Sequence, residues 1–254
     1  MKHVINFGGG LYSWAAARRV VDTFGTKDVT LLFADTKMED ADMPRFLLEC
    51  SQNLGISLTV IQDGRTPWEV FKDERFLGNS RVDPCSKILK RQLLDKWHKD
   101  NCDPLDTVIY VGLGWDEYHR VERFKRRLEN WTVSAPLCEP PYLTKNQIAS
   151  LAESFSIQAP RLHREGFPHN NCGGFCIKAG QAQFKRLLQV RPELYAFHEG
   201  KEQEFRTFIG KDVSILREQS KGVERSLTLR VLRERIEKQL PIDEFDWGGC
   251  GCAV

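Results

Sequence analysis

The sequence predicts an α/β protein with an open parallel sheet covered by helices on both faces, followed by a smaller helical part. Short apolar runs alternate with helical patterns, three glycines directly follow the first apolar run, and the alternation stops after about residue 130. Strands and helices that alternate at this spacing are typical of a parallel sheet with helical crossovers. We therefore expect an α/β core over residues 1–135 and a helical region over residues 136–254 that ends in a flexible tail.

The predicted elements follow the apolar periodicity along the chain. Short apolar runs predict strands at residues 4–7, 29–33, 58–61 and 107–111. Apolar residues at helical spacing predict core helices at residues 12–21, 41–53, 86–98 and 117–128. The same spacing predicts C-terminal helices that follow Thr144 to residue 154 and that cover residues 177–189, 192–208 and 226–239. Thr144 is the expected N-cap of the first of these, because its hydroxyl can accept from backbone N–H groups of the first turn.

The bulk composition is that of an ordinary globular protein. The 254 residues are 41% hydrophobic and carry a formal net charge of +2, which gives no overall case for a nucleic-acid or membrane partner. No segment approaches the roughly 18 consecutive apolar residues of a membrane span. The first residues enter a strand pattern directly and lack the apolar region of a signal peptide. We expect a cytoplasmic protein with no membrane partner.

A glycine triplet, Gly8, Gly9 and Gly10, connects the first predicted strand to the first predicted helix. Backbone N–H groups at a helix N-terminus, the helix dipole and the absence of side chains make such a loop suitable for an anion. Ser13 adds a hydroxyl in the first turn. The spacing matches neither the Walker-type loop nor the dinucleotide fingerprint. The alternative is a tight turn that needs flexible residues.

Eight cysteines in a chain expected in the reducing cytoplasm argue against a disulfide framework. Cys85 precedes a predicted helix, where the helix dipole stabilises a thiolate. Two close pairs, Cys172 with Cys176 and Cys250 with Cys252, are more typical of metal binding or thiol chemistry. The alternatives are core packing for the first three thiols and a frayed terminus for the last two.

Acidic and basic residues gather after the fourth predicted strand. Asp116 and Glu117 come first, and Arg120 opens a basic helix that continues to Arg127. The carboxyl ends of parallel strands are where open α/β sheets bind ligands, which favours a substrate-facing role for these three residues. The alternative is an ordinary solvated face, the commoner fate of charged helices.

Five segments resemble the adenine nucleotide alpha-hydrolases, or PP-loop enzymes, and among them the phosphoadenosine phosphosulfate (PAPS) reductase-like group. Residues 8–13 are similar to the SGGxDS loop, with Gly8 in place of its first serine and Tyr12 in place of its aspartate. Residues 32–39, 84–90, 111–120 and 162–176 are similar to the FxDT…E, CTxxLK, G.RxDES.xR and LYxxGFxRxGCxxC segments, in the family's order. The second cysteine of the last segment is one residue further on. The resemblance runs from about residue 3 to 190.

This resemblance implies an adenine nucleotide, ATP or PAPS, bound by residues of the glycine loop and of the second strand's end. These residues are Gly8, Gly9, Gly10, Ser13, Asp35 and Thr36. The alternative for Asp35 and Thr36 is an Asx-type cap of the next helix. The resemblance also implies a [4Fe–4S] cluster on Cys85, Cys172 and Cys176, with zinc as the second choice. Cys138, Cys250 or Cys252 then supplies a fourth ligand, or that position stays open.

The tail is similar in place to the catalytic cysteine of PAPS reductases. Cys250 and Cys252 are therefore expected to attack the nucleotide's sulfur and resolve the intermediate, with a thiol reductant completing the cycle. A second hypothesis is an ATP-dependent sulfurtransferase or modifier of a nucleic-acid base, which grips phosphate through the helix 120–127. Tyr12 in place of the aspartate counts against ATP cleavage. A third hypothesis is a non-catalytic nucleotide-sensing subunit, and a homo-oligomer is left open.

Overall fold

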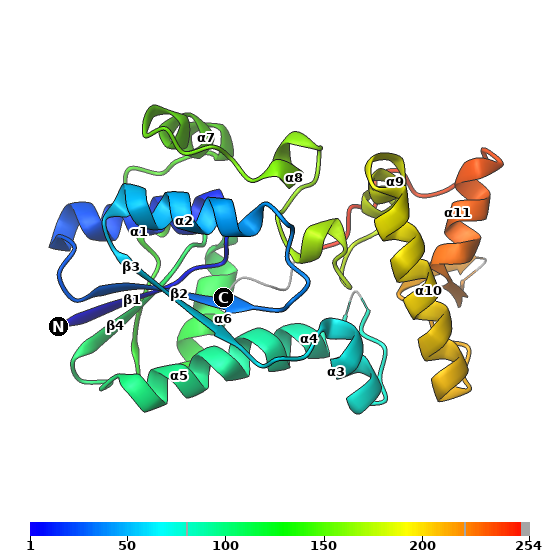
Figure 1. Ribbon diagram of the computed structural model, residues 1–254, viewed down its shortest axis with the longest axis horizontal. Helices are drawn as coiled ribbons and strands as arrows, with labels where there is room; N and C mark the ends of the chain where they lie inside the picture. The colour runs from blue at the N-terminus through cyan, green and yellow to red at the C-terminus, as the bar shows by residue number, and fades with distance from the viewer. Residues whose placement is uncertain (80, 221, 250–254) are drawn as a thin grey trace.

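A computed structural model describes residues 1–79, 81–220 and 222–249 of the chain. Its centre is a five-stranded sheet in the order β3-β2-β1-β4-β5, with every neighbouring pair parallel (Figure 1). The strands are β1 (Lys2–Asn6), β2 (Val29–Asp35), β3 (Ser57–Gln62), β4 (Thr107–Val111) and β5 (Thr132–Ser134). The four predicted strands and the parallel sheet are confirmed. The short edge strand β5 was not predicted.

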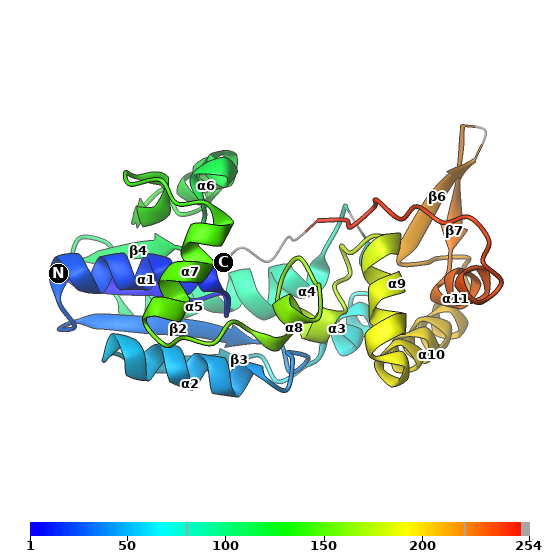
Figure 2. The same cartoon turned by 90° about the horizontal axis from the view of Figure 1, so that it is seen from above.

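Helices cover both faces of the sheet, as predicted (Figures 1 and 2). On one face, Trp14 and Phe46 pack in a single apolar cluster with the strand residue Leu31. On the other, Leu94 packs against Leu32 in one cluster and a further helix covers β4 in another. The first face carries α1 (Leu11–Phe24) and α2 (Met43–Leu54), with α7 (Lys145–Ser154) packed against α1, and the second carries α5 (Leu93–Asn101) and α6 (Tyr118–Arg127).

The α/β core extends further along the chain than residue 135. Ile148 and Ala152 of α7 are buried in the same apolar cluster as α1, and so is Ile157 after the helix. Thr144 caps α7 as predicted, since its hydroxyl accepts from the Gln147 backbone N–H group. The prolines near residue 136 mark a change of pattern, but α7 packs against α1 of the core.

The C-terminal region is a second packed unit at the far end of the molecule (Figure 1). Trp68 and Phe71 from the first half of the chain are buried in it beside Tyr195 and Phe205. Its elements are α3 (Pro67–Asp73), α9 (Gln181–Val190), α10 (Pro192–Ile209), β6 (Leu216–Ser220), β7 (Val223–Leu227) and α11 (Leu229–Glu237). The antiparallel β6–β7 hairpin departs from the purely helical prediction.

The predicted helix at residues 86–98 is part of a longer helical segment. It begins as α4 (Pro84–Ser86), continues through a π-helical stretch (Lys87–Gln92) and ends as α5. Lys90 within the π-helical stretch is almost fully buried, and its Nζ lies 3.2 Å from Glu39 Oε1. A π-helical insertion re-aims side chains and is frequent at functional sites. Here it turns a lysine inward toward the loop after β2.

Asp40 joins the α/β core to the chain that follows it. Its side chain is fully buried, and Arg161 Nη2 lies 2.9 Å from its Oδ1. Arg191, which precedes α10, pairs with the other carboxylate oxygen and also with Glu165. Breaking a buried pair by removing one partner is strongly destabilising, because it leaves an uncompensated charge. This network therefore fixes α8 (Arg161–Arg164) and the end of α9 to the loop after β2.

Glu202 of α10 organises the C-terminal unit. Its carboxylate is 1% exposed and accepts from the backbone N–H groups of Ile215 at 2.9 Å and Leu229 at 2.7 Å. These two bonds attach the hairpin and α11 to α10. Burial raises the pKa of Glu202 to about 7, although both hydrogen bonds oppose this effect.

We expect the stability of the wild type to depend on pH through Glu202. Because its pKa in the folded chain lies above the ordinary 4.5, the stability it contributes is complete below about pH 4.5 and is lost as the pH rises through about 7. The loss amounts to about 3 kcal/mol. A Glu202→Gln variant has no carboxyl group to titrate at this position. The difference in urea-unfolding free energy between the wild type and this variant should therefore change between about pH 4.5 and 7. A Glu204→Gln control, with an exposed carboxylate, keeps the wild-type profile; identical profiles for all three proteins would contradict the assignment.

Across the described ranges 1–79, 81–220 and 222–249, none of the helices combines the length and apolar character that crossing a bilayer requires.

Candidate active site

A cavity of about 390 Å³ opens at the carboxyl edge of the sheet. It lies after β1 and β4, neighbours at which the strand order reverses. Open α/β sheets bind ligands at such a switch point. Its lining comes from five segments, at residues 8–13, 112–120, 145–148, 163–171 and 247–249. The site therefore draws on both the α/β core and the last described residues of the chain.

The glycine loop forms one wall of the cavity. The first i→i−4 hydrogen bond of α1 runs from Trp14 N to Gly10 O at 3.1 Å, so the preceding N–H groups of the helix have no intrahelical partner. Those groups and the positive end of the helix dipole make an anion site. The Ser13 hydroxyl donates to Gly10 O at 2.8 Å, and would have to rotate to reach a bound phosphate. Gly8, Gly10 and Ser13 line the cavity as predicted residues of the loop.

Gly9 lies on the side of the glycine loop that faces away from the cavity. Its φ of +73° is a left-handed conformation, and a Cβ there would lie 2.7 Å from the Met43 side chain. Its carbonyl accepts from Asn170 Nδ2 at 3.1 Å. Gly9 is thus turned toward α2 and the loop before Cys172, and the cavity lining does not include it.

Gly112 holds the glycine loop against the end of β4. A Cβ at Gly112 would lie 2.5 Å from Ser13 Cα and 2.7 Å from Ser13 N. Both contacts are to backbone, which cannot move away without displacing the first turn of α1. The close approach of these two segments therefore requires glycine at this position.

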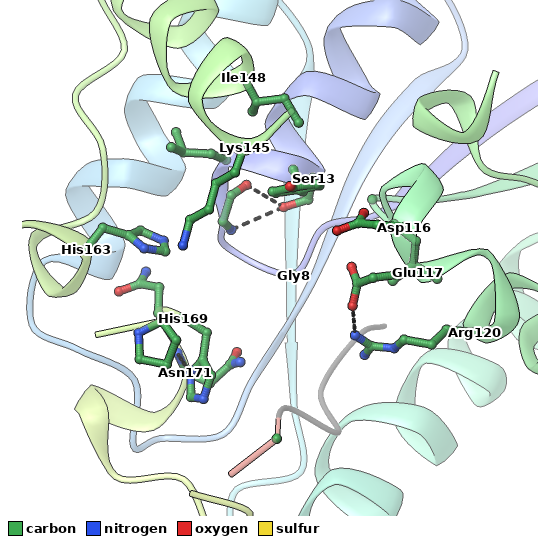
Figure 3. A pocket seen from close by; sticks show the side chains of 18 of the residues that line it. Gly8, Ser13, Asp116, Glu117, Arg120, Lys145, Ile148, His163, His169 and Asn171 are labelled. Atoms are coloured by element: carbon green, nitrogen blue, oxygen red, sulfur yellow. Dashed lines mark hydrogen bonds and ion pairs between the residues drawn. The ribbon is translucent and has the colours of Figure 1, made fainter. Parts of the chain in front are cut away.

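Acidic side chains lie across the cavity from a lysine and a histidine (Figure 3). Asp116 and Glu117 lie on one side, and Glu117 forms an ion pair with Arg120. Lys145 and His163 lie on the other. Asp116, Glu117 and Arg120 all line the cavity, and the substrate-facing role expected of them stays a prediction.

His163 is neutral at neutral pH. Burial lowers its pKa to about 4, and the positive charges of Lys145 and His169 act in the same direction. An anion bound among these groups would raise the pKa of His163, because a negative charge favours the protonated imidazole. The side chains of Lys145, His163 and His169 thus give this wall a capacity for phosphate. The resemblance did not assign them, although Lys145 directly follows the recognisable cap Thr144.

The sequence predicted a flexible tail, but up to Gly249 this prediction is wrong: backbone hydrogen bonds attach residues 243–249 to the chain before and within α9. Gly248 forms an isolated antiparallel bridge with Ala179, and Gly249 N donates to Lys178 O at 2.9 Å. Ala182 N donates to Asp246 O, also at 2.9 Å. These bonds bring Trp247, Gly248 and Gly249 to the cavity. We call residues 243–249 the C-terminal strap; Cys250 and Cys252 lie outside the described residues.

Asp35 and Thr36 are engaged in local structure. Asp35 Oδ1 accepts from Lys37 N at 2.8 Å, which is a local Asx-type turn, and the Thr36 hydroxyl donates to Glu39 Oε1 at 3.0 Å. Neither residue caps the next helix, because the N-cap of α2 is Asp42. The cavity lining includes neither residue. Their contact with a nucleotide stays a prediction.

The three predicted cluster ligands are all buried. Cys85 lies in the first turn of α4 and shares an apolar cluster with Cys176. Cys172 begins a run of left-handed residues through Gly174, and its backbone N–H donates to Glu39 Oε2 at 3.2 Å. Among residues 1–79, 81–220 and 222–249, no group of three or more His, Cys, Asp or Glu side chains could hold a metal ion. A cluster or zinc ion on these cysteines therefore stays a prediction.

No family model and no curated protein matches the chain. Among solved structures, it is similar to a PAPS reductase from Candida auris in a phosphate complex, at 12% identity over 68% of this chain and 81% of that one, with a TM-score of 0.48. It is also similar to an NMN synthetase from Francisella tularensis, at 15% identity over 95% of this chain and 87% of that one, with a TM-score of 0.44. The strand order and the glycine loop of this chain fit the resemblance to PP-loop enzymes.

Proposed function

We propose that the protein is an enzyme that binds an adenine nucleotide or sulfonucleotide in this cavity and acts on it with the thiols of Cys250 and Cys252. The observation that carries the proposal is the position of Gly249, which lines the same cavity as the glycine loop. Cys250 is the next residue in the chain, and consecutive Cα atoms are about 3.8 Å apart. The strap therefore supports a role for these thiols at the site.

The cavity suits the phosphates of a nucleotide. It offers the N-terminus of α1, the ammonium group of Lys145 and the imidazole groups of His163 and His169. Its volume of about 390 Å³ lies within the range of small-molecule sites, about 300–1,000 Å³. Asp116 and Glu117 on the opposite wall can accept hydrogen bonds from ribose or base.

Thiol chemistry on a sulfonucleotide follows from two neighbouring cysteines. One thiolate attacks the sulfur of PAPS, the sulfur–oxygen bond breaks and adenosine bisphosphate leaves. The second thiolate then attacks the sulfur of the first cysteine, which releases sulfite and leaves a disulfide. A thiol reductant restores the two thiols. The positive groups of the cavity favour the thiolate form that both attacks require.

The test compares PAPS and ATP as substrates of the full chain and of its cysteine variants. We expect adenosine bisphosphate from PAPS, with a rate at least about a thousandfold lower in Cys250→Ser or Cys252→Ser. A Cys102→Ser control changes a thiol after α5, away from the cavity, and keeps the wild-type rate. Wild-type rates in both tail variants would exclude the thiol step, whereas nucleotide titration tests the binding site separately. Iron and zinc analysis of anaerobically purified protein decides whether Cys85, Cys172 and Cys176 belong to a metal site.

A second candidate is ATP-dependent modification of a nucleic-acid base, and one observation favours it: an exposed tryptophan, Trp115, precedes the cavity residue Asp116. Release of pyrophosphate from ATP would support this function over reduction of PAPS. Binding of either nucleotide without turnover would support a sensing role instead.

A further inference from the structure

Two exposed aromatic side chains form a pair that is not part of the apolar core. Trp115 is 47% exposed and Tyr142 is 57% exposed, and their ring centroids lie 6.3 Å apart at an interplanar angle of 63°. Trp115 Nε1 donates to Leu143 O at 3.2 Å, which fixes the indole between two loops. An ordered indole that keeps half its surface in water offers a planar face to a ligand.

Both aromatic residues are close in the sequence to residues that line the cavity. Trp115 lies between the lining residues Leu113 and Asp116, and Tyr142 lies three residues before the lining residue Lys145. The loop of Trp115 thus contributes to the cavity wall, and the loop of Tyr142 leads into helix α7, which also contributes to it. A planar group that stacks on Trp115 would be held beside the opening.

Helix α6 follows Trp115 closely along the chain and carries exposed basic side chains. Tyr118 in its first turn is 50% exposed, and Lys125 Nζ lies 5.9 Å from the centre of its ring. Within the part of the chain that the structure describes, neither Arg123 nor Arg126 forms an ion pair with a carboxylate. Exposed guanidinium groups of this kind are available to an external anion.

We propose that this surface, the aromatic–basic rim, binds a single-stranded nucleic acid. The rim comprises three aromatic and three basic residues: Trp115, Tyr118, Tyr142, Arg123, Lys125 and Arg126. Single-strand sites combine aromatic faces, on which unpaired bases stack, with basic side chains that follow the phosphates. In a duplex the faces of the bases are stacked and cannot pack on aromatic side chains. An acidic peptide would bind the basic residues but would not require the aromatic rings.

This proposal goes beyond the thiol chemistry and does not depend on it. The nucleotide site uses the end of α1 and the opposite wall, whereas the rim uses the outer surface of α6 and the loop before α7. A strand held on the rim would have one unpaired base next to the cavity opening. The rim therefore indicates a second ligand, a single-stranded nucleic acid. An enzyme that acts only on a small sulfonucleotide would not need such a surface.

The test measures fluorescence anisotropy of labelled single-stranded RNA and DNA of about 12 nucleotides, within single-strand site sizes of about 4–16. The full-length protein carries the Cys250→Ser and Cys252→Ser changes, so that binding is observed without thiol chemistry. We expect Trp115→Ala with Tyr142→Ala to weaken binding about tenfold or more. A Phe197→Ala control removes an aromatic ring that is 49% exposed beside Lys201 and leaves binding unchanged.

Salt dependence tests the basic half of the rim. Replacing Arg123 and Arg126 by alanine is expected to reduce the slope of log affinity against log salt by about 1 for each lost contact, and an Arg225→Ala control leaves it unchanged. Equal affinity for a duplex of the same sequence, or no effect of the aromatic changes, would overturn the proposal. Loss of ATP or PAPS affinity with unchanged oligonucleotide binding would assign the aromatic pair to the mononucleotide instead.

Discussion

A Gly180→Ala variant is expected to lose thiol-dependent turnover while it keeps its fold. A Cβ at Gly180 would lie 2.2 Å from Asp246 O, whereas the backbone of Gly180, at φ −97°, is one that alanine adopts freely. The added methyl group therefore displaces the strap and leaves α9 intact. Misplacement of a reacting group by about 1 Å costs about a hundredfold in rate, so we expect at least that loss. Turnover of PAPS and nucleotide titration measure the two effects separately.

The matched control is Gly200→Ala, because a Cβ at that position has no atom within 4 Å. It lies within α10, where alanine stabilises a helix relative to glycine. Gly180→Ala and Gly200→Ala should both give cooperative unfolding, and only the first should lose turnover. If Gly180→Ala retains the wild-type rate, the strap does not deliver the thiols.

A Gly112→Ala variant is expected to lose nucleotide binding. Its Cβ would meet the backbone of Ser13 at 2.5 Å, which forces the first turn of α1 away from β4. A phosphate that loses two charge-assisted hydrogen bonds loses about 1.5–3 kcal/mol for each, so affinity falls about a hundredfold or more. Overpacking also lowers the free energy of unfolding by about 1–3 kcal/mol. Calorimetric titration with ATP and with PAPS measures the affinity.

A control is needed to show that the lost nucleotide affinity of Gly112→Ala does not result from lower stability alone. Glu202→Gln serves as the control, because it removes an acceptor from the buried N–H groups of Ile215 and Leu229 in the C-terminal unit, away from the cavity. It is expected to be destabilised by a similar amount and to bind the nucleotide normally at a temperature where it is folded. Equal affinities for Gly112→Ala and the wild type would show that the anion does not sit on α1.

The central sheet was predictable because its strands are buried and continuous in apolar residues. Residues 29–33 lie between two helices and read as a strand without ambiguity, and the glycines after β1 marked the turn to α1. The β6–β7 hairpin was missed because many of its side chains are charged or polar: Arg217 faces Ser226 and Glu218 faces Arg225. Such strands carry no apolar alternation, and their pairing depends on neighbours in the C-terminal unit.

The site was predictable where its residues follow a strand. Asp116 and Glu117 follow β4 and reach the cavity, and so do Gly8 and Ser13 after β1. Lys145 begins α7, which follows the last strand of the sheet. Its position at the cavity depends on the packing of α7 against α1, which the sequence does not reveal. The strap was misread because its glycines suggest mobility, whereas glycine at 180 and 248 allows two backbones to approach closely.

The strap also constrains how the chain can be extended. Gly249 lines the cavity, so a fusion partner joined within five residues of it would begin no more than about 18 Å from the cavity wall. An affinity tag or fluorescent protein at this end would crowd the opening and compete with large ligands. The amino terminus emerges at the start of β1, at the opposite end of the sheet (Figure 1). Fusion partners placed there leave the entrance unobstructed.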